Sequence, residues 1–295
     1  MRSWYPAAAV LALLASGARA AQDPPGFDAT VVELRAAIEA GELEKAVRAG
    51  EKAIALEPRN SEALDLLGRA YGLTARDSQL LEQMRLAKKA RDCFRRAVEA
   101  DPSNVAALVD LARYDMQAPA VLGGGKKKAK EAADRVLALE PARGHILLGE
   151  LAQKEKNIDE AEAQFRRAMA ADAGGLRGRR ALSEFFVSRK RYGEARTLWT
   201  EARGVNLPAA VPGYELAGIA LASGEGLAPA LEDLEAALPR AESGGEPSPA
   251  EVHERLARVY QKLGNRAEAV AELQSALTLA PGRADWRRNL DALKK

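Results

Sequence analysis

Residues 123–128 read Gly-Gly-Gly-Lys-Lys-Lys, a run that could hold an anion. Glycines that open a helix expose backbone N–H groups to a phosphate or carboxylate, and neighbouring lysines add positive charge. Gly124, Gly125, Lys126 and Lys127 are therefore candidate residues of an anion or small-ligand site. The run is not an ordinary phosphate loop, because no strand precedes it and Lys127 stands where Ser or Thr would bind magnesium. A flexible loop followed by a solvated lysine face explains the same residues, since lysines at a helix start oppose the helix dipole slightly.

The two histidines, His145 and His253, are the other residues that could suggest a metal site. Each lies four residues before a small residue, Gly149 or Ala257, so the two occupy equivalent positions of different repeats. We therefore expect them to be far apart, each replacing an aromatic residue at the start of a helix rather than sharing a metal. The sequence has no Gly-x-Ser-x-Gly and no His-Glu-x-x-His motif. We expect no enzyme, metal or cofactor, because no cluster of titratable residues supports a site between the repeats.

A small residue precedes a bulky one by four positions at regular intervals along the chain. The clearest copies are Ala90 and Phe94, Ala161 and Phe165, Ala195 and Trp199, Ala230 and Leu234, and Ala269 and Leu273. Ala161 and Ala195 are 34 residues apart, and Ala230 follows 35 residues later. A period of this length is typical of stacked helical hairpins. The small residue would let two helices approach, and the bulky one would fill the gap to the next pair.

This pattern resembles the tetratricopeptide-repeat family over nearly all of residues 28–281. The family has Trp-x2-Leu-Gly-x2-Tyr on the first helix of each repeat, Ala-x3-Phe on the second, and then Pro. Leu67, Gly68 and Tyr71 match the first-helix pattern, and six other copies follow parts of it. The resemblance implies an all-α fold, a right-handed superhelical solenoid of about seven helix-turn-helix repeats with a C-terminal capping helix.

Three segments break the period. Repeat 2 holds about ten extra residues between Gly72 and Leu81, which predict a lengthened second helix that projects beyond the stack. Repeat 3 carries an extra loop at residues 118–125. Residues 241–249 are rich in Gly, Pro and Ser, which predicts a flexible linker that could hinge the last repeat.

The expected division of the chain follows from these breaks. Residues 21–27 form a short flexible segment, 28–240 repeats 1–6, 241–249 the linker, and 250–295 repeat 7 with the capping helix. The cap is predicted at residues 284–294, with Trp286 and Leu290 turned inward. Gly41 and Gly264 suit helix ends that need a positive φ.

The family resemblance also implies where a partner would bind. In that family the first helices line a concave groove, and two side chains of each helix, one turn apart, point into it. The implied groove residues are Asp65, Arg69, Leu108, Ala112, Ile146, Glu150, Arg180, Glu184, Glu215, Ile219, Glu254 and Arg258. No Asn occupies these positions, which disfavours the grip on a peptide C-terminus that some members use. An amphipathic helix or an extended segment with an apolar middle fits better.

Residues 1–20 differ from the rest of the chain. Arg2 supplies a positive start, residues 7–15 are apolar, and small residues flank Arg19. This order is typical of a secretory signal peptide, here cleaved after Ala20, and a buried N-terminal helix is the weaker alternative. The apolar run is too short to span a bilayer, and no later segment is apolar enough to do so. We therefore expect an exported protein, in the periplasm of a Gram-negative bacterium by the habit of the family.

Cleavage after Ala20 would leave 42 basic and 42 acidic residues, because it removes two of the 44 arginines and lysines. A neutral chain with interspersed charges offers no electrostatic footprint for nucleic acid. The one cysteine, Cys93, is expected to be a small buried hydrophobe. The sequence favours a non-catalytic scaffold or adaptor of the cell envelope that binds a protein or peptide. An anion or small-ligand receptor at residues 123–128 is the alternative, and the sequence leaves the oligomeric state open.

Overall fold

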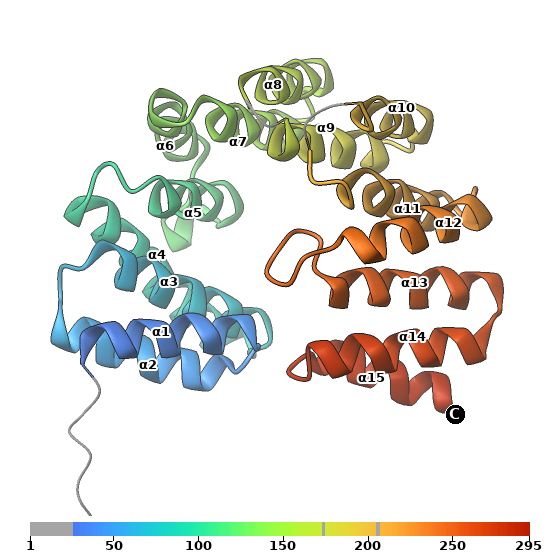
Figure 1. Ribbon diagram of the computed structural model, residues 1–295. Coiled ribbons are helices and arrows are strands. Elements are labelled where there is room, and N and C mark those ends of the chain that lie inside the picture. Colours follow the sequence, from blue (N-terminus) through green and yellow to red (C-terminus); the bar gives the residue numbers. More distant parts are fainter. Residues whose placement is uncertain (1–25, 173–174, 205–206) are drawn as a thin grey trace, which may run out of the picture.

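The computed structural model describes residues 26–172, 175–204 and 207–295, in which it has fifteen α-helices, two 3₁₀ turns and no strand (Figure 1). The helices are α1 (Phe27–Glu39), α2 (Leu43–Leu56), α3 (Ser61–Arg76), α4 (Leu80–Ala100), α5 (Val105–Gln117), α6 (Lys126–Leu139), α7 (Pro141–Lys154), α8 (Ile158–Ala171), α9 (Leu176–Ser188), α10 (Tyr192–Ala202), α11 (Val211–Ser223), α12 (Leu227–Ala237), α13 (Pro249–Leu263), α14 (Arg266–Leu279) and α15 (Ala284–Lys294). The 3₁₀ turns are η1 (Ala120–Leu122) and η2 (Leu238–Arg240). The predicted all-α solenoid is confirmed.

The predicted signal peptide lies outside the described residues, and no helix within them is long and apolar enough to cross a membrane.

Successive helices pair into hairpins, from α1 with α2 to α13 with α14, and α15 packs on the last of them. Each first helix also contacts the second helix of the preceding hairpin, so the hairpins stack along a curved path (Figure 1). The hydrophobic core is accordingly a series of clusters between neighbouring hairpins. First helices face the inside of the curve, most clearly α5, α7, α9 and α11. The two ends of the curve come close together, since a Cβ placed on Gly282 would lie 3.9 Å from the Cβ of Ala40.

Small residues set how closely the two helices of a hairpin approach. The alanines of the predicted small slot, Ala90, Ala161, Ala195, Ala230 and Ala269, are all buried. On the facing first helix, a Cβ on Gly68 would lie 2.5 Å from the ring of Phe94. A Cβ on Gly149 would lie 2.8 Å from the ring of Phe165 in the same way. In these two repeats, glycine therefore makes the room that the phenylalanine ring occupies.

The turns inside the hairpins use left-handed backbone. Gly41 has φ 71° and Gly264 has φ 83°, as predicted from their positions. Lys156 and Lys190 stand in the corresponding turns of repeats 4 and 5, with φ 61° and 59°. A side chain with a Cβ is disfavoured in this region, so these two turns hold backbone strain.

The lengthened helix and the capping helix that the sequence predicted are both present in the structure. Helix α4 has 21 residues, whereas the other second helices have 11 to 14, which confirms the lengthened helix. The first turn of α4 projects into solvent, with Leu80 69% and Leu81 83% exposed. At the other end, α15 has the predicted bounds and buries Trp286 and Leu290. Cys93 is buried, as expected.

The linker at residues 241–249 turns back toward the inside of the curve (Figure 1). An Oε2 atom of Glu246 accepts a hydrogen bond from Nη1 of Arg180 on α9, at 2.6 Å. The linker is therefore tied to repeat 5 as well as joining repeats 6 and 7.

Candidate partner-binding surface

A row of ion pairs connects the first helices of neighbouring repeats. Arg69 on α3 pairs with Asp110 on α5. Arg113 on α5 binds Glu150 on α7 through two hydrogen bonds, at 2.7 and 3.1 Å. Further along the curve, Arg180 on α9 pairs with Glu215 on α11 at 2.6 Å. These pairs lie on the face that the first helices turn inward, so they mark the inner surface of the solenoid.

The phase of repeat 3 differs from the prediction by one residue. The side chains of Asn60 and Asn104 cap α3 and α5 in the same way, each accepting a hydrogen bond from the backbone N–H three residues later. Counted from these caps, Arg113 is the equivalent of Arg69. Leu108 and Ala112 are fully buried, so their assignment to the groove was wrong.

The reason for this error is the choice of tyrosine. Leu108 and Ala112 precede Tyr114 by six and two residues, as Asp65 and Arg69 precede Tyr71, but the residue equivalent to Tyr71, counted from the caps, is Asp115. The correct positions for repeat 3 are therefore Val109, which is buried, and Arg113, which is half-exposed.

The other predicted groove residues divide into two groups. Asp65, Ile146 and Ile219 are buried between repeats and offer a partner little surface. The charged residues remain accessible: Arg69, Glu150, Arg180, Glu184, Glu215, Glu254 and Arg258. The structure brings Ile146, Glu150, Arg180 and Glu184 together in one hollow. Glu254 and Arg258 lie in repeat 7, 3.9 Å from each other and outside that hollow.

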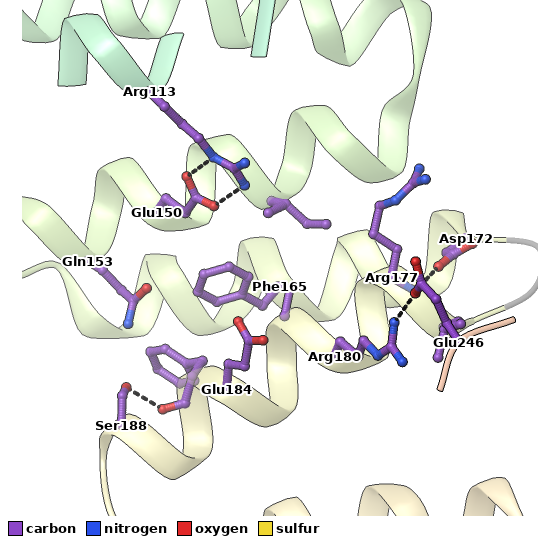
Figure 2. Close-up of a pocket in the computed structure, with 14 residues that line it drawn as sticks. Arg113, Glu150, Gln153, Phe165, Asp172, Arg177, Arg180, Glu184, Ser188 and Glu246 are labelled. Atoms are coloured by element: carbon purple, nitrogen blue, oxygen red, sulfur yellow. Dashed lines mark hydrogen bonds and ion pairs between the residues drawn. The ribbon is translucent and has the colours of Figure 1, made fainter. Parts of the chain in front are cut away.

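The hollow formed by repeats 4 and 5, here the charged hollow, has a volume of about 640 Å³ (Figure 2). Arg113, Glu150, Arg180 and Glu184 supply its charged walls, and Glu246 of the linker closes one side. Its apolar lining includes Ile146, Phe165, Leu176 and Phe185. The pKa of Glu184 is raised, first because burial penalises the charged form and second because the carboxylate of Glu215 is near.

A second hollow, here the apolar hollow, has a volume of about 740 Å³ and lies between repeats 2 and 3. Its lining includes Leu73 of α3, Leu80 and Met84 of α4, and Val121 and Leu122 of η1. The two insertions thus build it together, because α4 supplies one wall and η1 another. Both insertions were predicted from the sequence, but the hollow was not, because nothing in the sequence shows that the two insertions meet.

The two hollows share one residue, because Arg113 lines both. Its pKa is raised by its hydrogen bonds to Glu150, so the guanidinium stays charged and held between the hollows. The inner surface therefore has an apolar part and a charged part that adjoin at the Arg113–Glu150 pair. A ligand long enough to fill both would be a peptide segment rather than a small molecule.

The loop before α6 does not form the anion cradle that its glycines suggested. The N–H of Gly125 donates to the carbonyl of Asp115 at 2.8 Å, and that of Gly124 donates to the carbonyl of Pro119 at 3.3 Å. Lys126 pairs with Glu155 at 2.8 Å. Both glycine amides are thus engaged inside the chain, so the geometry does not support an anion site at Gly124 and Gly125.

Lys127 lies 3.9 Å from Glu131 of its own helix, as expected of a solvated lysine face. Lys128 instead donates to the carbonyl of Gly123 at 2.9 Å. These contacts favour the alternative interpretation of residues 123–128, a loop followed by lysines on the solvent-exposed surface of a helix.

The two histidines occupy equivalent places, as predicted. Nδ1 of His145 lies 2.7 Å from Oε1 of Gln164, and Nδ1 of His253 lies 2.6 Å from Oε2 of Glu272. In both cases the histidine is on a first helix and its neighbour is 19 residues later on the second helix of the same repeat. Within the described ranges, no group of three or more His, Cys, Asp or Glu side chains is placed to hold a metal ion.

Comparison with known proteins agrees with this architecture. Residues 250–283 match one tetratricopeptide-repeat family model, and residues 78–104 and 142–174 match another. No curated protein matches the sequence. A tetratricopeptide repeat protein from Parabacteroides merdae is similar in structure with a TM-score of 0.50 and 16% identity, over 91% of this chain and 99% of that one.

Two further solved structures show the same fold. Yeast Tom70 has a TM-score of 0.62 and 16% identity, over 92% of this chain and 57% of its own. A thermophilic protein of the same repeat type from Thermus thermophilus has a TM-score of 0.50 and 19% identity, over 66% of this chain and 100% of its own. Stacked hairpins, buried small slots and matching repeat models together identify the chain as a tetratricopeptide-repeat protein.

Proposed function

We propose that the protein is a non-catalytic scaffold that binds a segment of a partner protein along its inner surface. The observation that carries this proposal is the pair of adjoining hollows, which meet at Arg113. An apolar depression with a charged continuation suits a peptide segment, because apolar side chains supply affinity and charges fix the register. The repeat family supports the same class of function, since its members act chiefly through protein–protein interaction.

The cell envelope is the proposed compartment. Its support is the order of residues 1–20, a basic start followed by an apolar run and small residues. The partner would then be another envelope protein, held outside the cytoplasm.

A site-specific photo-crosslinker tests the binding surface. Leu80 lines the apolar hollow and is 69% exposed, so a photoreactive residue there leaves the core unchanged. Glu201 on α10 is exposed and lines neither hollow, which makes it the matched control. In cells, we expect one defined adduct from position 80 and none from position 201. Equal labelling from both positions, or none from either, would contradict the proposed surface.

The compartment is tested separately. We expect the mature protein in a periplasmic extract, with Ala21 as its first residue by N-terminal sequencing. An intact chain that begins at Met1 and stays in the cytosolic fraction would remove the envelope assignment and leave the binding surface untouched.

A further inference from the structure

Three arginines line the charged hollow: Arg113 and Arg180 are already bound by hydrogen bonds, whereas Arg177 lies 3.7 Å from Glu140. Arg113 gives both of its hydrogen bonds to Glu150. Arg180 lies between two carboxylates, donating to Glu215 at 2.6 Å and to Glu246 of the linker at 2.6 Å. An acidic ligand would have to break these charge-assisted bonds before it could pair with Arg113 or Arg180. Arg113 and Arg180 therefore do not favour an acidic occupant.

One acidic side chain of the hollow is different. Glu184 makes no hydrogen bond or ion pair with any residue that the structure describes, and no dashed line reaches it in Figure 2. It lies one turn after Arg180 on α9, and its carboxylate is beside Phe165 in the hollow. Burial and the nearby Glu215 and Glu150 raise its pKa, which means that the neighbouring arginines do not fully compensate its negative charge. A positive charge supplied from outside would relieve this repulsion.

The surroundings of Glu184 fit a long basic side chain. Leu176 and Ala181, both half-buried, contribute apolar surface to the lining. The methylene groups of Lys or Arg pack against such surface, while the charged end remains free to pair with a carboxylate. A small cation would gain only the charge interaction, so the combination favours a side chain of a protein.

We infer that the partner segment carries a Lys or Arg that pairs with Glu184 and an apolar side chain that enters the apolar hollow. The inference rests on the proposed function, because it specifies the chemistry of the segment bound there. The Arg113–Glu150 pair lies between the two parts and separates the basic residue of the segment from the apolar one. The recognition is thus the reverse of a grip on a carboxylate, since the protein supplies the negative charge.

A displayed library of random peptides, each about 12 residues long, tests this without knowledge of the partner, because such a peptide reaches about 40 Å when extended. The purified protein is the bait, and the Glu184→Gln variant is selected in parallel, since Gln keeps the shape and removes the charge. Glu201→Gln is the matched control, because Glu201 is exposed and outside both hollows. Leu80→Ser probes the apolar hollow at a side chain that is 69% exposed and whose loss leaves folding intact.

We expect peptides selected by the wild type to share one Lys or Arg at a fixed spacing from an apolar residue. Glu184→Gln should bind the best of them about tenfold more weakly and should no longer select the basic residue. Leu80→Ser should weaken the same peptide, and Glu201→Gln should not.

Two results would overturn the inference in different ways. Selected peptides without a basic residue, or equal binding by Glu184→Gln and wild type, would refute the recognition by Glu184 and leave the proposed function standing. No enrichment of any peptide by the wild type would refute the proposed function itself.

Discussion

The contact between Gly149 and Phe165 shows how single residues set the spacing of a hairpin. A Cβ at position 149 would lie 2.8 Å from the ring, closer than real Cβ contacts come. Ala257 fills the equivalent slot in repeat 7, where the bulky residue of the second helix is Leu273, and both are buried in the same cluster. Glycine and phenylalanine in repeat 4 are thus a matched pair, as alanine and leucine are in repeat 7.

This pairing predicts the outcome of a double-mutant cycle. Gly149→Ala should lower the free energy of unfolding, because overpacking costs about 1–3 kcal/mol while the better helix propensity of alanine returns only about 1 kcal/mol. Phe165→Leu should lower it by about 1–2 kcal/mol through the space it leaves. The double variant should be more stable than the sum of the two single-variant losses predicts, as measured by urea unfolding followed by circular dichroism. Strict additivity would show that the two residues do not share a slot.

A buried carboxyl group makes stability depend on pH. Asp65 is only 3% exposed, and burial, followed by repulsion from Asp110, raises its pKa to about 7. Because the pKa is higher in the folded state than in the unfolded chain, the folded state binds this proton more tightly. The resulting stabilisation is complete below about pH 4 and is lost as the pH rises through about 7.

Asp65→Asn keeps the shape of the side chain and removes the titration. The variant should gain stability relative to wild type as the pH rises from about 4 to about 7, by at most about 4 kcal/mol. Thermal unfolding across this pH range measures the difference. Asp291→Asn, at an exposed position on α15, is the control and should follow the wild type at every pH. Parallel curves for wild type and Asp65→Asn would show that Asp65 does not titrate in this range.

At the scale of the elements, the turns inside the hairpins are not equally relaxed. Lys156 and Lys190 have φ values of 61° and 59°, where Gly41 and Gly264 stand in other repeats. Lys156→Gly should therefore raise the free energy of unfolding, by up to about 1 kcal/mol, since the left-handed penalty exceeds the extra chain entropy of glycine. Lys154→Gly, in the last turn of α7, should instead lower it by roughly 0.5–1 kcal/mol. Denaturant midpoints of the two variants should move in opposite directions, and a common direction would contradict the argument.

The elements themselves were largely predictable from the sequence, because side-chain size repeats with the period of a hairpin. The bounds of α15 and the extra length of α4 follow from local spacing alone. The predicted groove positions of repeat 3 were wrong by one residue, because Tyr114 lies one residue before the position equivalent to Tyr71. The cap at Asn104 gives the correct alignment of the repeat. A cap is a local signal, so counting from Asn60 and Asn104 would have found Arg113.

The hollows were beyond prediction for a different reason. The apolar hollow requires that Met84 of α4 and Val121 of η1 meet, and the charged hollow requires that Glu246 of the linker reach Arg180. These residues are separated by 37 and 66 positions, more than one repeat period in each case. Their meeting depends on the curvature of the whole stack, which accumulates from small rotations between hairpins and leaves no mark in local sequence.

At the scale of the whole molecule, the curve of hairpins nearly closes on itself. The turn after α1 and the turn before α15 come together at Ala40 and Gly282 (Figure 1). The inner surface is consequently enclosed by the stacked hairpins and, between the two ends, by these turns. A partner segment reaches the hollows through the open faces of the ring or after its ends separate. The contact between the ends is small, because neither helix of the first hairpin packs against α14 or α15. The ends are therefore held mainly by the curvature of the stack between them.

A disulfide across the ends tests this geometry directly. The Cβ separation of 3.9 Å falls in the range of about 3.5–4.5 Å that disulfides require, so Ala40→Cys with Gly282→Cys should form a bond within one chain under mild oxidation. Cys93 should not compete, because it is buried and its pKa is raised to about 11 by that burial. The oxidised double variant should migrate faster than the reduced one on a denaturing gel, and neither single variant should show this shift. Only slow-migrating species, the product of crosslinking between two chains, would mean that the ends stay apart in solution and the ring is open.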